Sequence, residues 1–117
     1  MKKLTILIAM LIAIGGCSNE VPEDQLEWRE GLIKYEVNSQ TPFTGRSVTY
    51  YDNGQLKKYA NYKDGKIYGV WKSYWDNGKV QIVGRAKDGK AHGLQEIYSR
   101  TGKLSQTDNF KDGEKIE

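Results

Sequence analysis

"YYDNGQL", residues 50–56, returns as "YWDNGKV" at 74–80 and, with more changes, as "YSRTGKL" at 98–104. When the chain is aligned with itself, three units of 24 residues begin at Gly45, Gly69 and Gly93, and no insertion is needed. A fixed period of this kind is typical of repeat proteins, in which each unit buries its surface against its neighbours. The sequence therefore predicts a stack of three similar units.

Each unit has the pattern of short strands joined by tight turns. "DNG" and "KDG" are hairpin signals, because glycine adopts positive φ and the preceding Asn or Asp tolerates turn geometry. At "DNG", a two-residue turn would place Tyr51 opposite Leu56, whereas a three-residue loop closed by a left-handed glycine places Tyr50 there. The second kind of pair is kept in all three units, as Tyr50/Leu56, Tyr74/Val80 and Tyr98/Leu104. We therefore predict the three-residue loop with a glycine bulge.

Strand alternation then predicts which side chains share a face of the sheet. We expect the core face to carry Tyr50, Leu56, Tyr62, Tyr74, Val80, Ala86, Tyr98, Leu104 and Phe110. The opposite face is expected to carry Tyr51, Lys57, Tyr59, Asn61, Trp71, Trp75, Gln81 and Arg85. This second face is mixed in character and partly solvated.

The first seventeen residues have the pattern of an export signal. Lys2 and Lys3 precede an apolar run, residues 4–14, which two glycines separate from Cys17. A helix of that run would span about 16 Å. Because the hydrocarbon layer is roughly 30 Å thick, we do not expect a permanent transmembrane anchor. Since Cys17 is the only cysteine, an internal disulfide is excluded.

The segment Ile14-Gly15-Gly16-Cys17 resembles the lipobox of bacterial lipoproteins. The resemblance implies that residues 1–16 are a signal peptide and that the membrane is bound through acyl chains, such as palmitate, on Cys17. An ordinary signal peptide with an accidental cysteine is the alternative. Ser18 stands where an aspartate tends to retain such lipoproteins at the inner membrane, so the resemblance favours the outer membrane of a bacterial envelope, facing the periplasm.

The rest of the chain predicts one small all-β domain. We expect residues 17–27 to be the acylated cysteine and an acidic tether, residues 28–44 to be an N-terminal capping hairpin around a turn at 38–40, and residues 45–117 to be three hairpin repeats. Removal of residues 1–16 leaves 16 basic and 15 acidic side chains. This near-neutral balance argues against a nucleic-acid partner.

The motifs "PFTG", "YYDNGQL", "KDGKIYGVW", "YWDNGKV" and "KDGKAHG" resemble the bacterial MORN-repeat variant family. The likeness covers residues 28–117 and implies an elongated antiparallel meander of β-hairpins with a non-enzymatic, protein-binding role. Many bacterial members are catalogued as antitoxins. Because an exported lipoprotein does not meet a cytoplasmic toxin, the resemblance favours an immunity-like protein of the envelope. The third unit departs from the pattern at Gln95, Ser99 and Arg100-Thr101, as expected for a C-terminal cap.

Candidates for catalysis have simpler explanations in the repeat. His92, the only histidine, occupies a column that holds Tyr68 in the preceding unit and Ile116 in the next, which indicates packing. The aspartates of the three "KDG" turns each stand alone, whereas calcium requires several oxygen ligands. No second histidine or cysteine can complete a zinc site. We therefore expect no catalytic residue, no metal and no cofactor.

The aromatic face is the remaining candidate for binding. Aromatic and arginine side chains dominate protein hot spots, so we predict a binding site at Tyr51, Tyr59, Trp71, Trp75 and Arg85. In the alternative interpretation, these rings only cover the sheet and stabilise their cross-strand neighbours; a stacked sugar ligand is a third possibility. The sequence thus predicts a lipid-anchored binding module without catalysis, with a structural scaffold of the outer membrane or of a membrane complex as the alternative. The oligomeric state is left open.

Overall fold

A computed structural model describes residues 19–116, so the predictions on the signal peptide, Cys17 and Ser18 lie outside the described residues. The N-terminal part contains β1 (Glu20–Pro22), the 3-10 helix η1 (Glu23–Gln25), β2 (Leu26–Arg29) and β3 (Ile33–Glu36). The repeats contain β4 (Gly45–Tyr50), β5 (Leu56–Lys63), β6 (Lys66–Ile67), β7 (Gly69–Tyr74), β8 (Val80–Lys87), β9 (Lys90–Ala91), β10 (Gly93–Tyr98), β11 (Leu104–Lys111) and β12 (Glu114–Ile116). Within residues 19–116, no helix has the length and apolar character needed to span a membrane.

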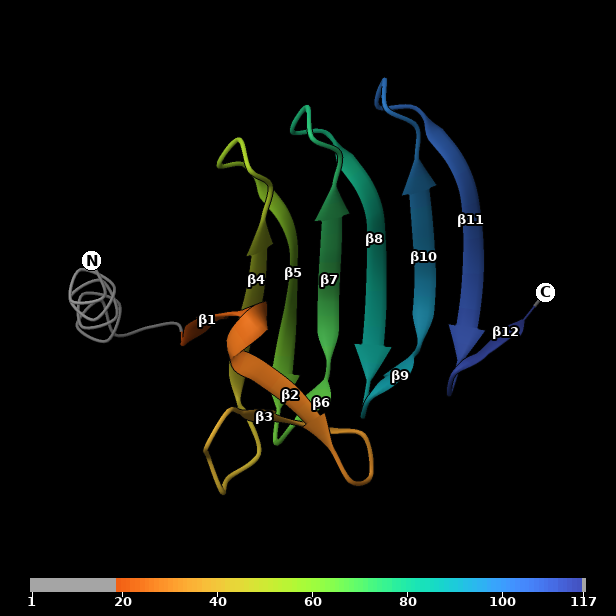
Figure 1. Cartoon of the computed structure of the whole chain (residues 1–117). Helices are drawn as coiled ribbons and strands as arrows, with labels where there is room; N and C mark the ends of the chain where they lie inside the picture. The colour runs from red at the N-terminus through yellow and green to blue at the C-terminus, as the bar shows by residue number, and fades with distance from the viewer. Residues whose placement is uncertain (1–18, 117) are drawn as a thin grey trace.

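One long sheet contains all the repeats. Its strand order is β1-β4-β5-β7-β8-β10-β11-β12, with the short strands β6 and β9 paired to β5 and β8 (Figure 1). Neighbouring strands run antiparallel, except that β1 lies parallel to β4. The predicted all-β, elongated meander of hairpins is therefore confirmed.

The "DNG" loops have the predicted three-residue form. In the first unit, Tyr50 pairs with Leu56, and the Tyr51 N–H donates to the Gln55 carbonyl at 2.8 Å. The Gly54 N–H donates back to the Tyr51 carbonyl at 2.9 Å, and Gly54 has a φ of 88°. These contacts define a type I turn closed by a left-handed glycine. The other two units repeat the pairing, with Tyr74 opposite Val80 and Tyr98 opposite Leu104.

A β-bulge beside each loop changes which side chains share a face. Tyr50 pairs with Leu56 but Thr49 pairs with Lys58, so Lys57 is an extra residue on its strand. The alternation shifts by one at this point. Thr49 therefore shares a face with Tyr62, whereas Tyr50 and Leu56 point to the other side. The same shift occurs at Gln81 and at Ser105.

The predicted core face is consequently wrong in its composition. Ala60 and Tyr62 are buried, at 2 % and 6 % exposure, whereas Tyr50 is 56 % exposed. The predicted set divides across the sheet. Tyr62, Ala86 and Phe110 lie on one face; Tyr50, Leu56, Tyr74, Val80, Tyr98 and Leu104 lie on the other.

The "KDG" turns are two-residue hairpin turns. Asp64 and Gly65 both have positive φ, at 51° and 81°, and Lys63 pairs with Lys66 across the turn. This is the geometry of a type I′ turn, in which Asp and Gly are favoured at the two central positions. The aspartate and glycine of the other two "KDG" turns have the same signs of φ. Turn formation therefore accounts for the three recurring aspartates.

The β2–β3 hairpin lies across one face of the first unit (Figure 1). We call this the capped face and the opposite side the open face. The hairpin and its flanks form the core with the sheet. The cluster consists of Val21, Leu26, Phe43, Ala60 and Tyr62, with Ile67 and Trp71 packed against it.

Residues 20–27 are folded and do not form the expected tether. Val21 and Leu26, which flank the acidic run, are both buried in the core. Asn19 also joins the sheet, because its carbonyl accepts the Arg46 N–H at 2.8 Å. The capping hairpin is present, but its turn lies at residues 30–32, not at 38–40. Arg29 pairs with Ile33 around a loop that contains positive φ at Gly31 and Leu32.

Candidate functional site

An uncovered apolar row crosses the open face. It consists of the three pairs that every unit keeps, and we call it the tyrosine row: Tyr50, Leu56, Tyr74, Val80, Tyr98 and Leu104. Tyr50 and Leu104, at its two ends, are 56 % and 54 % exposed, and the four between them are half-buried. The residues that define the repeat most clearly therefore remain accessible.

Basic side chains accompany the tyrosine row. The Arg46 guanidinium lies 4.3 Å from the centroid of the Tyr59 ring, and its Nε donates to Asn61 Oδ1 at 3.1 Å. Burial, with a smaller effect of neighbouring Tyr59, raises the pKa of Tyr74, and the charge of Arg46 opposes this shift. Further along, Arg85 Nη1 lies 3.5 Å from Glu96 Oε1. The open face thus combines exposed aromatic rings with arginine.

The five predicted binding residues do not lie on one face. Val70 pairs with Arg85 and Trp71 pairs with Gly84, so Trp71 and Arg85 point to opposite sides of the sheet. Trp71 packs against the core, and Tyr59 lies with Arg46 on the open face. The bulge causes this division, because without the extra residue Trp71 would pair with Val83 and share the face of Arg85. Whether these residues bind a partner stays a prediction.

Tyr51 and Trp75 join neighbouring units at the loop end of the sheet. The Tyr51 hydroxyl donates to the Tyr74 carbonyl at 2.6 Å, and Trp75 Nε1 donates to the Tyr98 carbonyl at 3.2 Å. Both bonds span 23 residues, so one unit holds the loop of the next. The second aromatic residue of the first and second loops is therefore a link between units.

The loop asparagines form a second set of links that sequence reasoning missed. Asn53 Nδ2 donates to the Asp76 carbonyl at 3.2 Å, and Asn77 Nδ2 donates to the Arg100 carbonyl at 3.0 Å. The sequence signal that could have predicted these links is the asparagine that recurs at the same position of the first two loops. In the third unit Thr101 takes this position, and its hydroxyl instead bonds to that of Ser99 at 2.9 Å. The departures of the third unit thus replace the two loop donors that link the earlier units.

Arg85 also has a structural role that the sequence analysis missed. The chain bulges between β6 and β7, where Asn61 Nδ2 donates to the Val70 carbonyl at 3.2 Å. Arg85 occupies the equivalent position one unit later, and its Nη1 donates to the Leu94 carbonyl at 2.7 Å. Arg85 therefore links the third unit to the second through this hydrogen bond.

A buried lysine of β3 lies between the cap and the sheet, with its Nζ 5.9 Å from the centroid of the Tyr62 ring. Lys34 is 3 % exposed, and its Nζ lies 2.6 Å from Glu23 Oε2 and 4.1 Å from the centroid of the Trp28 ring. Beside it, burial and the charge of Glu23 raise the pKa of Tyr62 to about 12, although a hydrogen bond from Ser47 partly opposes the shift. A hollow of about 330 Å³ adjoins these groups. The Glu23–Lys34 ion pair therefore lies at the edge of the core, beside Tyr62.

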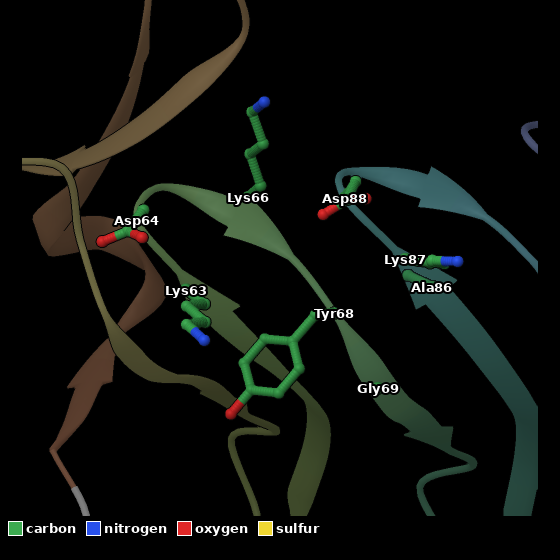
Figure 2. Close-up of a pocket in the computed structure, with 8 residues that line it drawn as sticks. All are labelled: Lys63, Asp64, Lys66, Tyr68, Gly69, Ala86, Lys87 and Asp88. Atoms are coloured by element: carbon green, nitrogen blue, oxygen red, sulfur yellow. The ribbon is translucent and has the colours of Figure 1, made fainter.

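A larger hollow of about 580 Å³ lies between the first two "KDG" turns. Figure 2 shows Asp64 and Asp88 on separate turns with Lys66 between them, and Tyr68 on the connection to β7. The site is open to solvent, and its charged groups belong to the turns. Its geometry offers no nucleophile beside a general base.

His92 takes part in the stacking of turns. Its Nδ1 accepts the Asp112 N–H at 3.3 Å, just as Thr44 Oγ1 accepts the Asp64 N–H at 2.9 Å two units earlier. Across residues 19–116, no group of three or more histidine, cysteine or acidic side chains is placed to hold a metal ion. The single histidine therefore has a clear structural use.

The comparisons with known proteins agree with this architecture. A model of the family described as MORN repeat variant matches residues 43–64, 67–88 and 91–112. Searches of curated proteins and of solved structures gave no significant match. MORN repeats are generally modules that bind proteins or membranes. Because the three matches cover more than half of the sequence and coincide with the three units of the sheet, the chain belongs to the MORN repeat variant family.

Proposed function

We propose that this chain is a non-catalytic protein-binding module held at the bacterial cell envelope by lipid on Cys17. The tyrosine row is the observation that carries the binding part of this proposal. All three units keep these residues, yet the row lies outside the core, with Tyr50 and Leu104 more than half exposed. A large exposed apolar patch marks an interaction surface, and tyrosine with arginine is the usual composition of binding hot spots.

The envelope location rests on the lipobox at residues 14–17. In its sharper form, the proposal describes an immunity-like protein that captures a toxin directed at the envelope. A structural scaffold of the outer membrane or of a membrane complex is the second candidate. Both faces of the sheet leave apolar side chains exposed, and each face can be occupied independently of the other. This arrangement favours the scaffold, because a scaffold binds more than one partner at once.

The absence of catalysis is also part of the proposal. His92 accepts a backbone N–H, and the aspartates of the "KDG" turns serve turn geometry. These are the groups that acid–base chemistry would need. Their structural uses support a binding role over an enzymatic one.

Site-specific photo-crosslinking in cells tests the binding face. A photoreactive residue replaces Tyr50 or Leu104 at the ends of the tyrosine row, and Lys63, the exposed last residue of β5 at the opposite end of the strands, serves as the control position. We expect one shared partner at positions 50 and 104 and none at 63. Equal labelling of abundant envelope proteins at all three positions would overturn the proposed binding face.

Metabolic labelling with a palmitate analogue tests the anchor separately. The full-length protein is expected to incorporate the label and to fractionate with membranes, and Cys17→Ser is expected to abolish both. A soluble, unlabelled wild-type protein would contradict the lipid anchor without affecting the binding face. Identification of the crosslinked partner distinguishes a toxin from a structural envelope protein.

A further inference from the structure

The cap and the repeats carry opposite net charges. Residues 19–44 contain six acidic and two basic side chains, a net charge of −4. Residues 45–116 contain eight acidic and fourteen basic side chains, a net charge of +6. The cap segment therefore carries the opposite net charge to the repeats, and within the cap Glu23 pairs with the buried Lys34.

The acidic cap covers only the first unit of the capped face. Ile67 and Trp71 pack against the core but remain partly exposed where the cap ends. Beyond them, the floor of the second unit is made of small residues, because the register places Gly84, Ala86 and Ala91 on this face. The apolar surface that the cap uses therefore continues past its edge as a shallow floor.

A notch lies where the cap meets this floor. It has a volume of about 270 Å³ and is lined by Trp28, Leu32, Lys66, Ile67 and Gly89. Trp28 and Leu32, on the cap side, are 52 % and 78 % exposed. Lys66 supplies the only charge in this lining. The notch has the size and character to accept one bulky apolar side chain beside a carboxylate.

A second exposed lysine stands on the same face. Lys58 pairs with Ser73 across the sheet, and its Nζ lies 5.5 Å from the centroid of the Trp71 ring. Lys58 therefore lies on this face beside the floor, and Lys66 lines the notch at the turn end of the sheet. An extended segment that runs from the notch along the floor would pass both lysines.

We propose that the notch and the adjoining floor dock an acidic, extended segment of a partner protein. One bulky apolar side chain of the segment fills the notch, and its carboxylates face Lys66 and Lys58. The occupant follows from charge complementarity and from continuity with the cap, which is itself acidic and lies on the same face. The surface is opposite the tyrosine row, so it adds a second binding site to the proposed function.

Titration of the full-length protein in detergent with defined peptides tests the proposal. The probe is a synthetic eight-residue peptide that alternates glutamate with leucine around a central phenylalanine. A second peptide carries lysine in place of glutamate. We expect the acidic peptide alone to bind and to shift the amide NMR signals of Gly89, Ile67 and Leu32. Equal binding of the lysine peptide, or shifts confined to the open face, would overturn the proposal.

Charge reversal locates the contact. The double variant Lys58→Glu/Lys66→Glu should weaken binding of the acidic peptide by about tenfold or more, with a smaller effect at high salt. The matched control, Lys79→Glu/Lys103→Glu, makes the same change of net charge at exposed positions beside the "DNG" and "RTG" loops. It should alter the affinity by less than about twofold. An equal loss of affinity in both variants would mean that the overall charge of the protein, and not Lys58 and Lys66, determines peptide binding. That result would contradict the proposed site.

Sedimentation separates a partner from a second copy of the chain. We expect the protein to show no self-association through the notch, so that the signals of Gly89 and Leu32 are independent of protein concentration. If these signals shift as a dimer forms, and Lys66→Glu prevents both changes, the occupant is a second copy and the proposed acidic partner is wrong. Because these measurements use purified protein, their outcome does not depend on the lipid anchor or on the open-face partner.

Discussion

The indole of Trp71 lies across the backbone of Gly84, its cross-strand partner, so that a Cβ at position 84 would collide with the ring. Gly84 is needed there for space, since its φ is not in the left-handed region. We expect Gly84→Ala to destabilise the fold by about 1–3 kcal/mol, the usual cost of overpacking a well-packed site. Urea denaturation measures the change.

A double-mutant cycle isolates this contact. In a Trp71→Ala background the ring is gone, so the added methyl of Gly84→Ala should cost less than about 0.5 kcal/mol. An equal loss in both backgrounds would mean that the ring does not cause the destabilisation.

The hydrogen bonds of Tyr51 and Trp75 between units predict that removing the donor lowers the stability of the fold even when the aromatic ring is kept. Trp75→Phe keeps an aromatic ring but removes the Nε1–H that donates to the Tyr98 carbonyl. Tyr51→Phe does the same for the hydroxyl that donates to the Tyr74 carbonyl. We expect each change to reduce the free energy of unfolding by about 0.5–1.5 kcal/mol. Tyr50→Phe is the control, since the structure gives its hydroxyl no such link, and an equal loss there would contradict the assignment.

The buried ion pair predicts an asymmetry between its two partners. Glu23→Gln leaves the 3 % exposed Lys34 ammonium without its carboxylate, and we expect a loss of about 2–3 kcal/mol. Lys34→Met keeps the packing of the stem and frees the half-exposed Glu23, so its cost should stay within about 1 kcal/mol. Thermal and urea unfolding of both variants tests the order. A larger loss in Lys34→Met would show that the ion pair itself, and not the unpaired buried charge, decides the stability.

The raised pKa of Tyr62 predicts a loss of stability at alkaline pH. Its pKa is about 12 in the folded protein and 10 in the unfolded chain, so the folded state retains the proton longer. The contribution is complete below pH 10 and is lost as the pH rises through 12. Its full size is about 3 kcal/mol. The free energy of unfolding between pH 9 and 12 measures it, and Tyr62→Phe should lack this part of the decline. Parallel curves for wild type and variant would exclude Tyr62 as its source.

The loop type could be predicted from sequence because the repeat supplies three copies of the same choice. Tyr50/Leu56 and its two equivalents have the separation that a three-residue loop requires, and the glycine column provides the positive φ. Turn chemistry is local, so a seven-residue stretch contains most of the information that determines it.

The faces could not be predicted in the same way, because one extra residue reverses them. Nothing in the side chain of Lys57 marks it as a bulge, and without the bulge the alternation carries Tyr50 and Tyr62 to the same side. The clearest available signal was the middle unit. There Gly84 and Ala86 are the small residues expected where a tryptophan covers the strand, whereas the larger Val80 lies half-buried in the tyrosine row on the other face.

The tether could not be predicted because its burial depends on distant partners. The segment around Val21 and Leu26 is acidic and contains a proline, which is typical of exposed chain. The two apolar side chains gain a core only when Ala60 and Tyr62 form the sheet beneath them. Such tertiary contacts override local composition, and no period reveals them in a segment outside the repeat.

The two ends of the sheet differ from its interior, and this difference determines how such a molecule can change size. β1 pairs along Arg46–Val48 and closes the first edge, while Ser99 and Thr101 lack the long donors that reach a following unit. A further 24-residue unit placed after the third unit would therefore lack the two loop donors that join the earlier units. A copy inserted between the first and second units would find every link in place. Gene duplication would therefore preserve the loop links only where the new copy is inserted within the array.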